Sequence, residues 1–208
     1  MNIVEFYNYS KNKNYNFEQG TWAHGYYGIF SYIVEQNNFK NIAEVGVGVG
    51  THANFILSNN RQIEKLILID PMKYYDNDAF ADDINSQVSV ENKNNFDKLY
   101  ELINEDLSKV SNKYVWIRKE SNDITDQDIP DNSLDAIFID GDHSYTAVLN
   151  DLKKYWNKVR SGGQILGDDI YMEQVALAVK DFANEIKVKY DLIVKENINY
   201  PIFRFIKP

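Results

Sequence analysis

Short apolar runs alternate with amphipathic stretches along the chain from about residue 40 to residue 190. Each run is followed by turn residues and then by a helical pattern. An order of strand, helix, strand that repeats in this way is typical of a parallel sheet with helices on both faces. The runs with the character of buried strands are Ile42–Val45, Leu66–Ile69, Val115–Ile117, Ala136–Ile139 and Ile165–Leu166. We therefore predict an α/β fold, a Rossmann-like doubly wound sheet that is mostly parallel.

Two later segments have the clearest helical periodicity. The first starts near His143 and carries apolar residues at spacings of three and four as far as Val159, before the glycines at 162 and 163 end it. The second runs from about Tyr171 to Lys187. Both segments follow predicted strands, so they predict helices that cover a face of the sheet.

The last part of the chain changes to a period of two. Asp191–Lys195 and Tyr200–Ile206 alternate polar with apolar residues around a turn at residues 196–199. This pattern is typical of an antiparallel hairpin. We expect the hairpin on the edge of the sheet, which brings the strands to seven.

The size of the chain favours one domain. With 208 residues, 44% of them apolar, it has enough material for one substantial core but hardly enough for two. We therefore predict a single domain over residues 1–208. Ahead of the sheet, Thr21–Gln36 has the pattern of an amphipathic, aromatic-rich helix, and we expect residues 1–38 to form an N-terminal lid or substrate segment.

Charge and composition exclude several classes of partner. The net charge is -9, and no stretch gathers the basic residues into a stripe that would neutralise phosphates, so we expect no nucleic-acid partner. No apolar run approaches the roughly 18 to 20 residues that span a bilayer, and the first twenty residues lack a secretory core, so we expect a cytoplasmic protein without a membrane partner. The absence of cysteine excludes disulfides and thiolate chemistry. The aromatic N-terminal segment leaves a homo-oligomer open.

Glycines follow the first predicted strand at every second position, at Gly46, Gly48 and Gly50. Such residues permit a tight turn and let a ligand approach the backbone, although a strand-to-helix turn alone can also require them. Asp70 ends the second strand, where a carboxylate can accept both hydroxyls of a ribose or can instead cap a helix. Together these features predict a nucleotide or nucleoside site at the carboxyl end of the sheet.

The cofactor class follows from two departures from the dinucleotide fingerprint. Position 51 holds Thr51 where that pattern requires glycine, and the acidic Glu44 lies just upstream of the loop, where a pyrophosphate would be repelled. S-adenosylmethionine suits an acidic approach better, because it has a ribose and a sulfonium cation and no phosphate. The block from Glu44 to Gly50 resembles the first motif of class I methyltransferases, with Asp70 matching the acid that follows it.

Acidic residues end the next two strands of the sheet, at Asp140, Asp168 and Asp169. Two carboxylates about 4 Å apart repel by about 4 kcal/mol at an effective dielectric of 20, so a converging set requires a cation or raised pKa values. Oxygen ligands favour a hard divalent ion such as Mg²⁺. The alternative is that some of these acids, Asp142 included, only cap helices.

The string from Ile139 to Tyr145 resembles the metal-dependent O-methyltransferases, both the catechol type and the bacterial type that methylates sugars of antibiotic glycosides. The resemblance extends from about Phe39 to Ile170. It implies metal ligation by the three acids above and a general base at His143, three residues after Asp140. Imidazole can accept a proton at neutral pH. Asp169 replaces the Asn that is usual in the catechol type, as in the sugar-modifying branch.

The resemblance also assigns the adenine side of the site, and the elements that its motifs leave free predict the pocket wall. The segment after the third strand usually touches the adenine, which places Ser121 and Asn122 there. The predicted pocket wall consists of Trp22, His24, Tyr26, Tyr27, the loop Met72–Tyr75, Tyr171 and Met172. An aromatic stripe on a helix is, however, more often core. Residues 76–95 form either a lid over the cofactor or a solvated loop, and His52 has no assigned role.

The resulting hypothesis is an S-adenosylmethionine-dependent O-methyltransferase acting on a hydroxyl of a small polar acceptor, with a sugar or glycoside as the expected class. The catalytic residues are then His143 and Asp140, the cofactor-binding residues are Glu44, Gly46, Gly48, Gly50, Asp70, Ser121 and Asn122, and the metal ligands are Asp140, Asp168 and Asp169. Three alternatives stay open at this point: a metal-independent methyltransferase acting on an amine or a phosphorus-linked oxygen, a nicotinamide-dependent oxidoreductase, and a non-catalytic cofactor-binding module.

Overall fold

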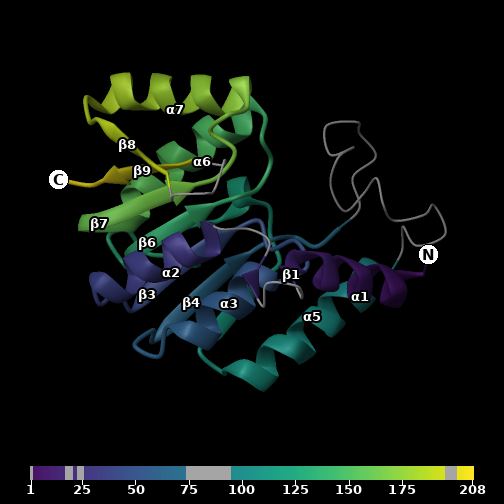
Figure 1. Ribbon diagram of the computed structural model, residues 1–208. Coiled ribbons are helices and arrows are strands. Elements are labelled where there is room, and N and C mark those ends of the chain that lie inside the picture. The colour runs from purple at the N-terminus through teal and green to yellow at the C-terminus, as the bar shows by residue number, and fades with distance from the viewer. Residues whose placement is uncertain (1, 17–20, 23–25, 74–94, 195–200) are drawn as a thin grey trace.

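A computed structural model describes residues 2–16, 21–22, 26–73, 95–194 and 201–208. Its main feature is a seven-stranded sheet in the order β5-β4-β3-β6-β7-β9-β8 (Figure 1). The strands are β3 (Asn41–Val45), β4 (Lys65–Ile69), β5 (Tyr114–Ile117), β6 (Leu134–Ile139), β7 (Val159–Gly167), β8 (Tyr190–Ile193) and β9 (Ile202–Ile206). The predicted α/β fold and its seven strands are confirmed.

The pairing directions also follow the prediction. The five strands from β5 to β7 pair in parallel, and β9 pairs antiparallel with both β7 and β8. The order of strands along the sheet reverses between β3 and β6, which lie side by side although two strands separate them in the sequence. Ligands of open α/β sheets bind at such a reversal, beyond the carboxyl ends of the strands. The fold therefore places the glycine-rich loop after β3 beside the acidic residues after β6.

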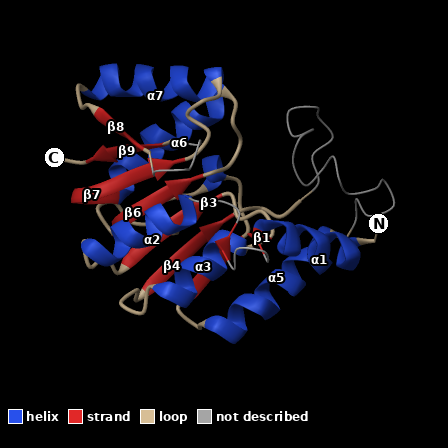
Figure 2. Ribbon diagram, in the orientation of Figure 1, coloured by secondary structure: helices blue, strands red, loops and turns tan. Residues whose placement is uncertain are grey.

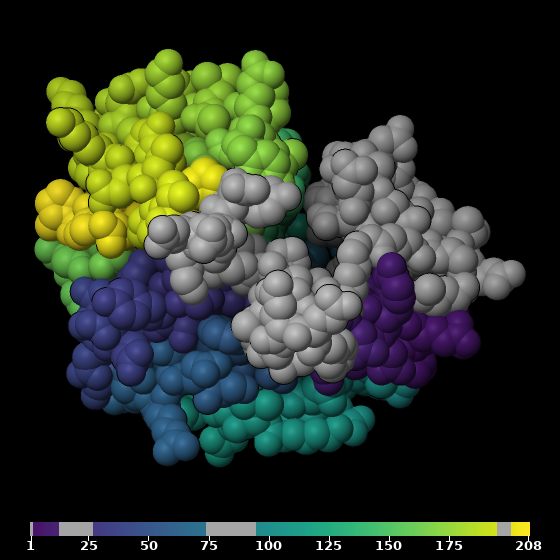
Figure 3. All heavy atoms as spheres, viewed as in Figure 1, coloured from purple at the N-terminus to yellow at the C-terminus, as the bar shows by residue number. Residues whose placement is uncertain are grey.

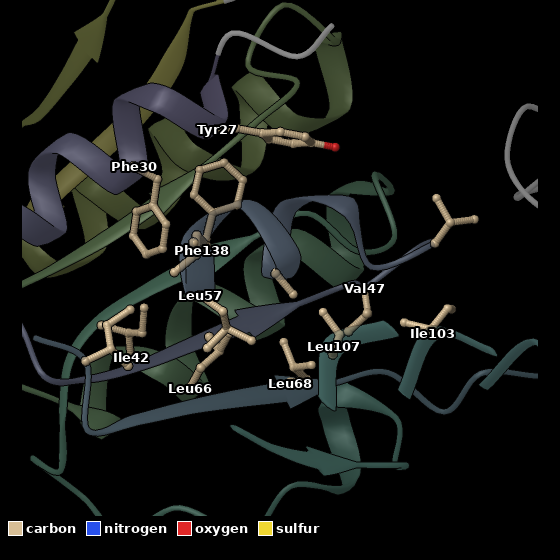
Figure 4. Close-up of a cluster of buried hydrophobic side chains, with 14 of the residues drawn as sticks. Tyr27, Phe30, Ile42, Val47, Leu57, Leu66, Leu68, Ile103, Leu107 and Phe138 are labelled. Atoms are coloured by element: carbon tan, nitrogen blue, oxygen red, sulfur yellow. The ribbon is translucent and has the colours of Figure 1, made fainter. Parts of the chain in front are cut away.

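Helices cover both faces of the sheet (Figure 2). On one face the core is built by α1 (Ile3–Asn14), α2 (Tyr26–Gln36), α3 (Thr51–Asn59) and α5 (Phe96–Val110). On the other face it is built by α6 (Tyr145–Lys158) and α7 (Glu173–Ile186). Figure 4 shows part of the first core, where Tyr27 and Phe30 of α2 approach Phe138 of β6. Because successive strand residues alternate between these two cores, the buried strands are mainly apolar on both sides, with Glu44 in β3 and Gln164 in β7 as exceptions.

The N-terminal region differs from the prediction. The helix begins at Tyr26, five residues later than expected, because Thr21–Trp22 forms a short strand (β2) that pairs with Tyr15–Asn16 (β1). The helix α1, which the sequence analysis did not predict, packs against α5, and the Tyr7 hydroxyl donates to Asp106 at 2.7 Å. The two helices lie side by side on the surface, purple and teal in Figure 3. Nothing observed tests the expected lid function.

The helix predicted to reach the glycines after Ser161 ends earlier, at Lys158. Val159 already pairs with Leu134 of β6, and a register shift between this pair and the next accommodates Gly162, whose φ is +73°. The strand β7 is therefore much longer than the predicted pair Ile165–Leu166. The predicted turn at residues 196–199 and the segment 76–94 lie outside the described residues. Among the residues that are described, no helix has both the length and the apolar character needed to cross a membrane.

Candidate cofactor and metal site

The glycine-rich loop after β3 packs directly against the end of β6. The Gly46 amide donates to the Ile69 carbonyl at 3.0 Å, and the Asp140 amide donates to the Val45 carbonyl at 2.8 Å. A Cβ on Gly46 would lie 1.9 Å from the Asp140 carbonyl oxygen, so this glycine is needed for packing. Gly48, with φ at +53°, is different, because a Cβ there would meet nothing within 4 Å. Gly48 therefore borders open space, as a ligand-binding glycine does.

The carboxylate of Asp70 ties this loop to the end of β4. Oδ2 accepts a hydrogen bond from the Val47 amide at 2.9 Å, and Oδ1 accepts one from the Met72 amide at 2.7 Å. Desolvation raises the pKa of Asp70, and its bonds to the backbone amides of Val47, Met72 and Gly48 oppose that rise. Asp70 thus directly follows β4, as predicted, and holds the two loops together.

Glu44 does not face the same space as the loop glycines. Its side chain is 1% exposed and lies below the loop, on the face of the sheet covered by α2 and α3. Its Oε1 atom is 3.2 Å from Nδ1 of His52, which is likewise buried. The structure therefore gives Glu44 a position beneath the predicted cofactor site.

Three side chains converge beyond the ends of β6 and β7. Asp140, His143 and Asp169 each offer one ligand atom, and these atoms all lie within 4.8 Å of one another. Nε2 of His143 is 2.9 Å from Oδ2 of Asp169 and 3.6 Å from Oδ1 of Asp140. The third predicted ligand, Asp168, is adjacent in sequence but is not part of this group. Its Oδ1 atom is buried and has no hydrogen-bond partner among the described residues.

The electrostatics of this cluster fit a cation. Burial, followed by the charges of Asp140 and Asp169, raises the pKa of Asp168 to about 8. The carboxylates of Asp140 and Asp169 beside its ring raise the pKa of His143 to about 10. Acidic side chains that converge raise one another's pKa values in this way, and the protonated His143 then offsets part of their negative charge. The oxygen-rich ligand set and the orphaned Asp168 oxygen fit a hard divalent ion, which would compete with the proton on His143.

Ser121 and Asn122, the residues assigned to the adenine, are hydrogen-bonded to α6. The Ser121 hydroxyl donates to the buried carboxylate of Asp151 and is 3.1 Å from the Tyr155 hydroxyl. Lys154 donates to the Asn122 carbonyl, while the Asn122 side chain is exposed. The structure therefore leaves Asn122 accessible to a ligand, whereas the Ser121 hydroxyl is already occupied by α6.

The buried Asp151 carboxyl predicts a pH-dependent stability. Burial raises its pKa to about 7, whereas an unfolded Asp titrates at about 3.9. The folded chain binds more protons than the unfolded chain between these values, so the contribution of Asp151 to stability falls as the pH rises from about 4 to about 7. We expect Asp151→Asn, which keeps an acceptor for Ser121, to be about 1 to 3 kcal/mol more stable than wild type at pH 8 and nearly equal to it at pH 4. Urea unfolding at both pH values measures the difference, and an equal effect at both would contradict the assignment.

The predicted pocket wall is only partly supported. Tyr27 is 3% exposed and belongs to the core, as the alternative interpretation of the aromatic stripe expected. Tyr171 and Met172, just beyond the acids of β7, are 58% and 38% exposed and border the site. His24 lies outside the described residues, and nothing is described of the Trp22 and Tyr26 side chains.

No sequence motif marked Asp151 or Lys154, and His52 had no predicted role. Asp151 carried a usable signal, because it shares one helix face with Val148, Leu152 and Tyr155, all buried. An acid on an apolar helix face needs a partner, and this partner proved to be Ser121.

Comparison with known proteins decides the family. A family model described as a methyltransferase domain matches residues 43–170, more than half of the chain. The chain belongs to this methyltransferase domain family. The matched span includes the glycine loop and the acids after β6 and β7, so the predicted resemblance to class I methyltransferases is confirmed for family and fold.

Solved structures agree on the fold of this methyltransferase domain. A proposed caffeoyl-CoA O-methyltransferase from Staphylococcus aureus superposes with a TM-score of 0.63 at 14% identity, covering 100% of this chain and 93% of that one. The methyltransferase PaMTH1 of Podospora anserina, solved with SAH bound, gives a TM-score of 0.60 at 11% identity, covering 99% of this chain and 87% of that one. At these identities the likeness shows the fold alone.

One curated relative has higher identity over a short stretch. It is uncharacterized protein R132 of Acanthamoeba polyphaga mimivirus, 40% identical over 60 residues, which are 27% of this chain and 27% of the relative. The chain therefore matches only about a quarter of that protein, which adds nothing on substrate or activity.

Proposed function

We propose that this methyltransferase domain transfers the methyl group of S-adenosylmethionine to a hydroxyl of a small polar acceptor, with a sugar or glycoside as the acceptor class. The observation that carries the proposal is the meeting of two features at one point. The loop of Gly46 packs on the backbone of Asp140, and Asp140 gathers with His143 and Asp169 at the same edge of the sheet. A donor at the loop and an acceptor at the acids are then neighbours, as in-line displacement requires.

The cofactor side of the proposal uses the loop and the ends of β4 and β5. Gly48 opens the backbone to the amino-acid end of the donor, and Asp70 offers its remaining lone pairs to the ribose hydroxyls. Asn122 is exposed at the place that the resemblance assigns to the adenine. Glu44, below the loop, contributes its charge and not a direct contact. The PaMTH1 structure with bound SAH supports the cofactor class for this fold.

The acceptor side uses the acids after β6 and β7. Asp140 and Asp169 of the cluster, with the neighbouring Asp168, whose buried Oδ1 has no hydrogen-bond partner among the described residues, would hold a divalent cation, Mg²⁺ or another ion of that charge. Such an ion, when bound, would lower the pKa of an acceptor hydroxyl and fix its direction. His143 lies among these oxygens and is the proposed general base. It must release its own proton first, and neutralisation of Asp140 and Asp169 removes the interaction that holds that proton. Tyr171 and Met172 are exposed beside the acids and can contact a sugar face.

Turnover of labelled cofactor with a panel of sugars and phenols tests the proposal. We expect methyl transfer to one of these hydroxyl acceptors and its loss after EDTA treatment. We also expect His143→Ala to keep the affinity for S-adenosylhomocysteine while turnover falls about 10²- to 10⁴-fold, the usual contribution of a positioned base.

Each rival function predicts a different result. Turnover that survives EDTA, with an amine or a phosphorus-linked oxygen as acceptor, indicates the metal-independent methyltransferase. Cofactor binding without turnover on any acceptor indicates the binding module. Wild-type turnover in His143→Ala removes the proposed base.

A further inference from the structure

A buried pair of ionisable side chains lies beneath the cofactor loop, and the proposed chemistry does not use it. Glu44 is in β3 and His52 is in the first turn of α3, and they are 1% and 3% exposed. Nδ1 of His52 is 3.2 Å from Oε1 of Glu44. The Oε2 atom of Glu44 is buried and has no hydrogen-bond partner in the described part of the chain. The contact with His52 therefore stabilises the buried Glu44 side chain.

Aromatic rings hold His52 in place. Its ring stacks on Tyr27 of α2 with centroids 4.7 Å apart and an angle of 15° between the planes. The Phe138 ring is inclined to it by 70°, with centroids 4.8 Å apart. The Tyr27 hydroxyl and the Thr51 hydroxyl, the latter at the start of α3, form a hydrogen bond of 2.8 Å. Figure 4 shows Tyr27 and Phe138 converging between α2 and the sheet. The imidazole thus packs against one ring from α2 and one from β6.

Packing alone does not account for this pair. A carboxylate with one oxygen unsatisfied costs free energy on burial, and an apolar pair of similar volume would fill the same space at a lower cost. Burial raises the pKa of Glu44, and the charge and hydrogen bond of His52 oppose that rise. The arrangement therefore favours stability less than an apolar pair would, and its position in the chain suggests another use.

The pair spans the two ends of the cofactor loop. Glu44 is two residues before Gly46, and His52 is two residues after Gly50, so their contact closes the loop at its base. Gly46, Gly48 and Gly50 all have positive φ. Glycine loses more conformational freedom on ordering than any other residue, so a loop with three of them binds a ligand weakly unless its ends are held.

We propose that His52 is a positioning residue for the cofactor, and that its contact with Glu44 is a clasp that holds the loop from Gly46 to Gly50 ready for S-adenosylmethionine. The inference rests on the proposed function, in which this loop binds the cofactor. His52 acts through the loop and not on the reacting atoms. Its loss therefore raises the KM for the cofactor and leaves kcat unchanged.

Two variants at position 52 separate the clasp from packing. His52→Phe keeps a ring against Tyr27 but removes the atom facing Glu44. His52→Asn removes the ring but places an amide nitrogen at the same δ position, where it can donate to Glu44. We expect His52→Phe to raise the Kd for S-adenosylhomocysteine and the KM for S-adenosylmethionine about tenfold with kcat within about twofold, and His52→Asn to stay within about threefold of wild type in Kd. Calorimetry and steady-state kinetics measure these values.

Hydrogen exchange in the protein without cofactor tests the clasp independently. We expect amides of the loop to exchange faster in His52→Phe than in wild type, and His52→Asn to restore the slower exchange. If the loop amides exchange in His52→Phe as they do in wild type, the clasp is overturned. It is also overturned if the Kd values of the two variants change in proportion to their melting temperatures, whether or not the new side chain contacts Glu44. Failure of the wild type to bind S-adenosylhomocysteine contradicts the proposed function instead, and loop exchange still decides the clasp.

Discussion

Replacement of Asp140 by Asn is expected to leave the fold and the affinity for S-adenosylhomocysteine nearly unchanged and to lower methyl transfer at least about 100-fold. Asp140 contributes an oxygen to the cluster with His143 and Asp169. Coordination of a reacting oxygen by a metal contributes several kcal/mol to a transition state, and each 1.36 kcal/mol corresponds to a factor of ten in rate. Turnover at saturating cofactor, beside calorimetric titration with S-adenosylhomocysteine, measures both parts of this result.

Asp142 supplies a matched control two residues away. It is an acid of the same loop, its Oδ1 accepts a hydrogen bond from the Ser144 amide, and it is not a member of the cluster. Asp142→Asn should therefore keep turnover within a few-fold of wild type. Equal losses in the two variants would show that the general negative charge of the loop matters and that ligation at Asp140 does not.

Replacement of Gly46 by Ala is expected to destabilise the fold, whereas replacement of Gly48 by Ala is expected to weaken cofactor binding. The Cβ of Gly46→Ala would lie 1.9 Å from the Asp140 carbonyl oxygen, an overlap with backbone that no side-chain movement relieves. We expect a loss of more than about 4 kcal/mol and a melting temperature lower by about 10 °C or more. The Cβ of Gly48→Ala would lie in open space. This substitution therefore lowers the free energy of unfolding only by the roughly 1 to 2 kcal/mol that a non-glycine residue costs in a left-handed conformation.

The effect of Gly48→Ala should appear in binding. Its methyl group projects into the space that the cofactor is proposed to fill, so the Kd for S-adenosylhomocysteine should rise at least about tenfold. Thermal melting and calorimetry on the two variants provide the test. A Gly48→Ala protein that binds the cofactor as wild type does would show that the loop lies away from it.

The parts of the fold that the sequence predicts are those with a strong local pattern. The runs ending at Val45, Ile69 and Ile139 are apolar on both faces except at Glu44 and sit between turn residues, so strand position and parallel pairing follow from the pattern. The strand Thr21–Trp22 could not be found in this way, because it is too short for periodicity and exists through its pairing with Tyr15–Asn16. The long start of β7 depends likewise on pairing with β6 and not on local preference.

The site shows the same division between local and tertiary information. Glycines and acidic residues at strand ends can be recognised in the sequence, and the sheet topology then brings Asp140 beside Asp169. Side-chain direction is not visible in this way. The Glu44 carboxylate lies beneath the loop because it contacts His52 of α3. The Ser121 hydroxyl donates to Asp151 because α6 packs against that segment. The assigned roles of Glu44 and Ser121 in cofactor binding stay predictions.

The central claim is that the ends of β6 and β7 share one divalent cation beside the bound cofactor. Titration of the S-adenosylhomocysteine complex with Mn²⁺, with the free ion followed by electron paramagnetic resonance, tests it most directly. We expect uptake of one ion per wild-type chain, with affinity reduced at least about tenfold in Asp140→Asn and unchanged in Asp142→Asn. No uptake by the wild type, or equal uptake by Asp140→Asn and wild type, would contradict it.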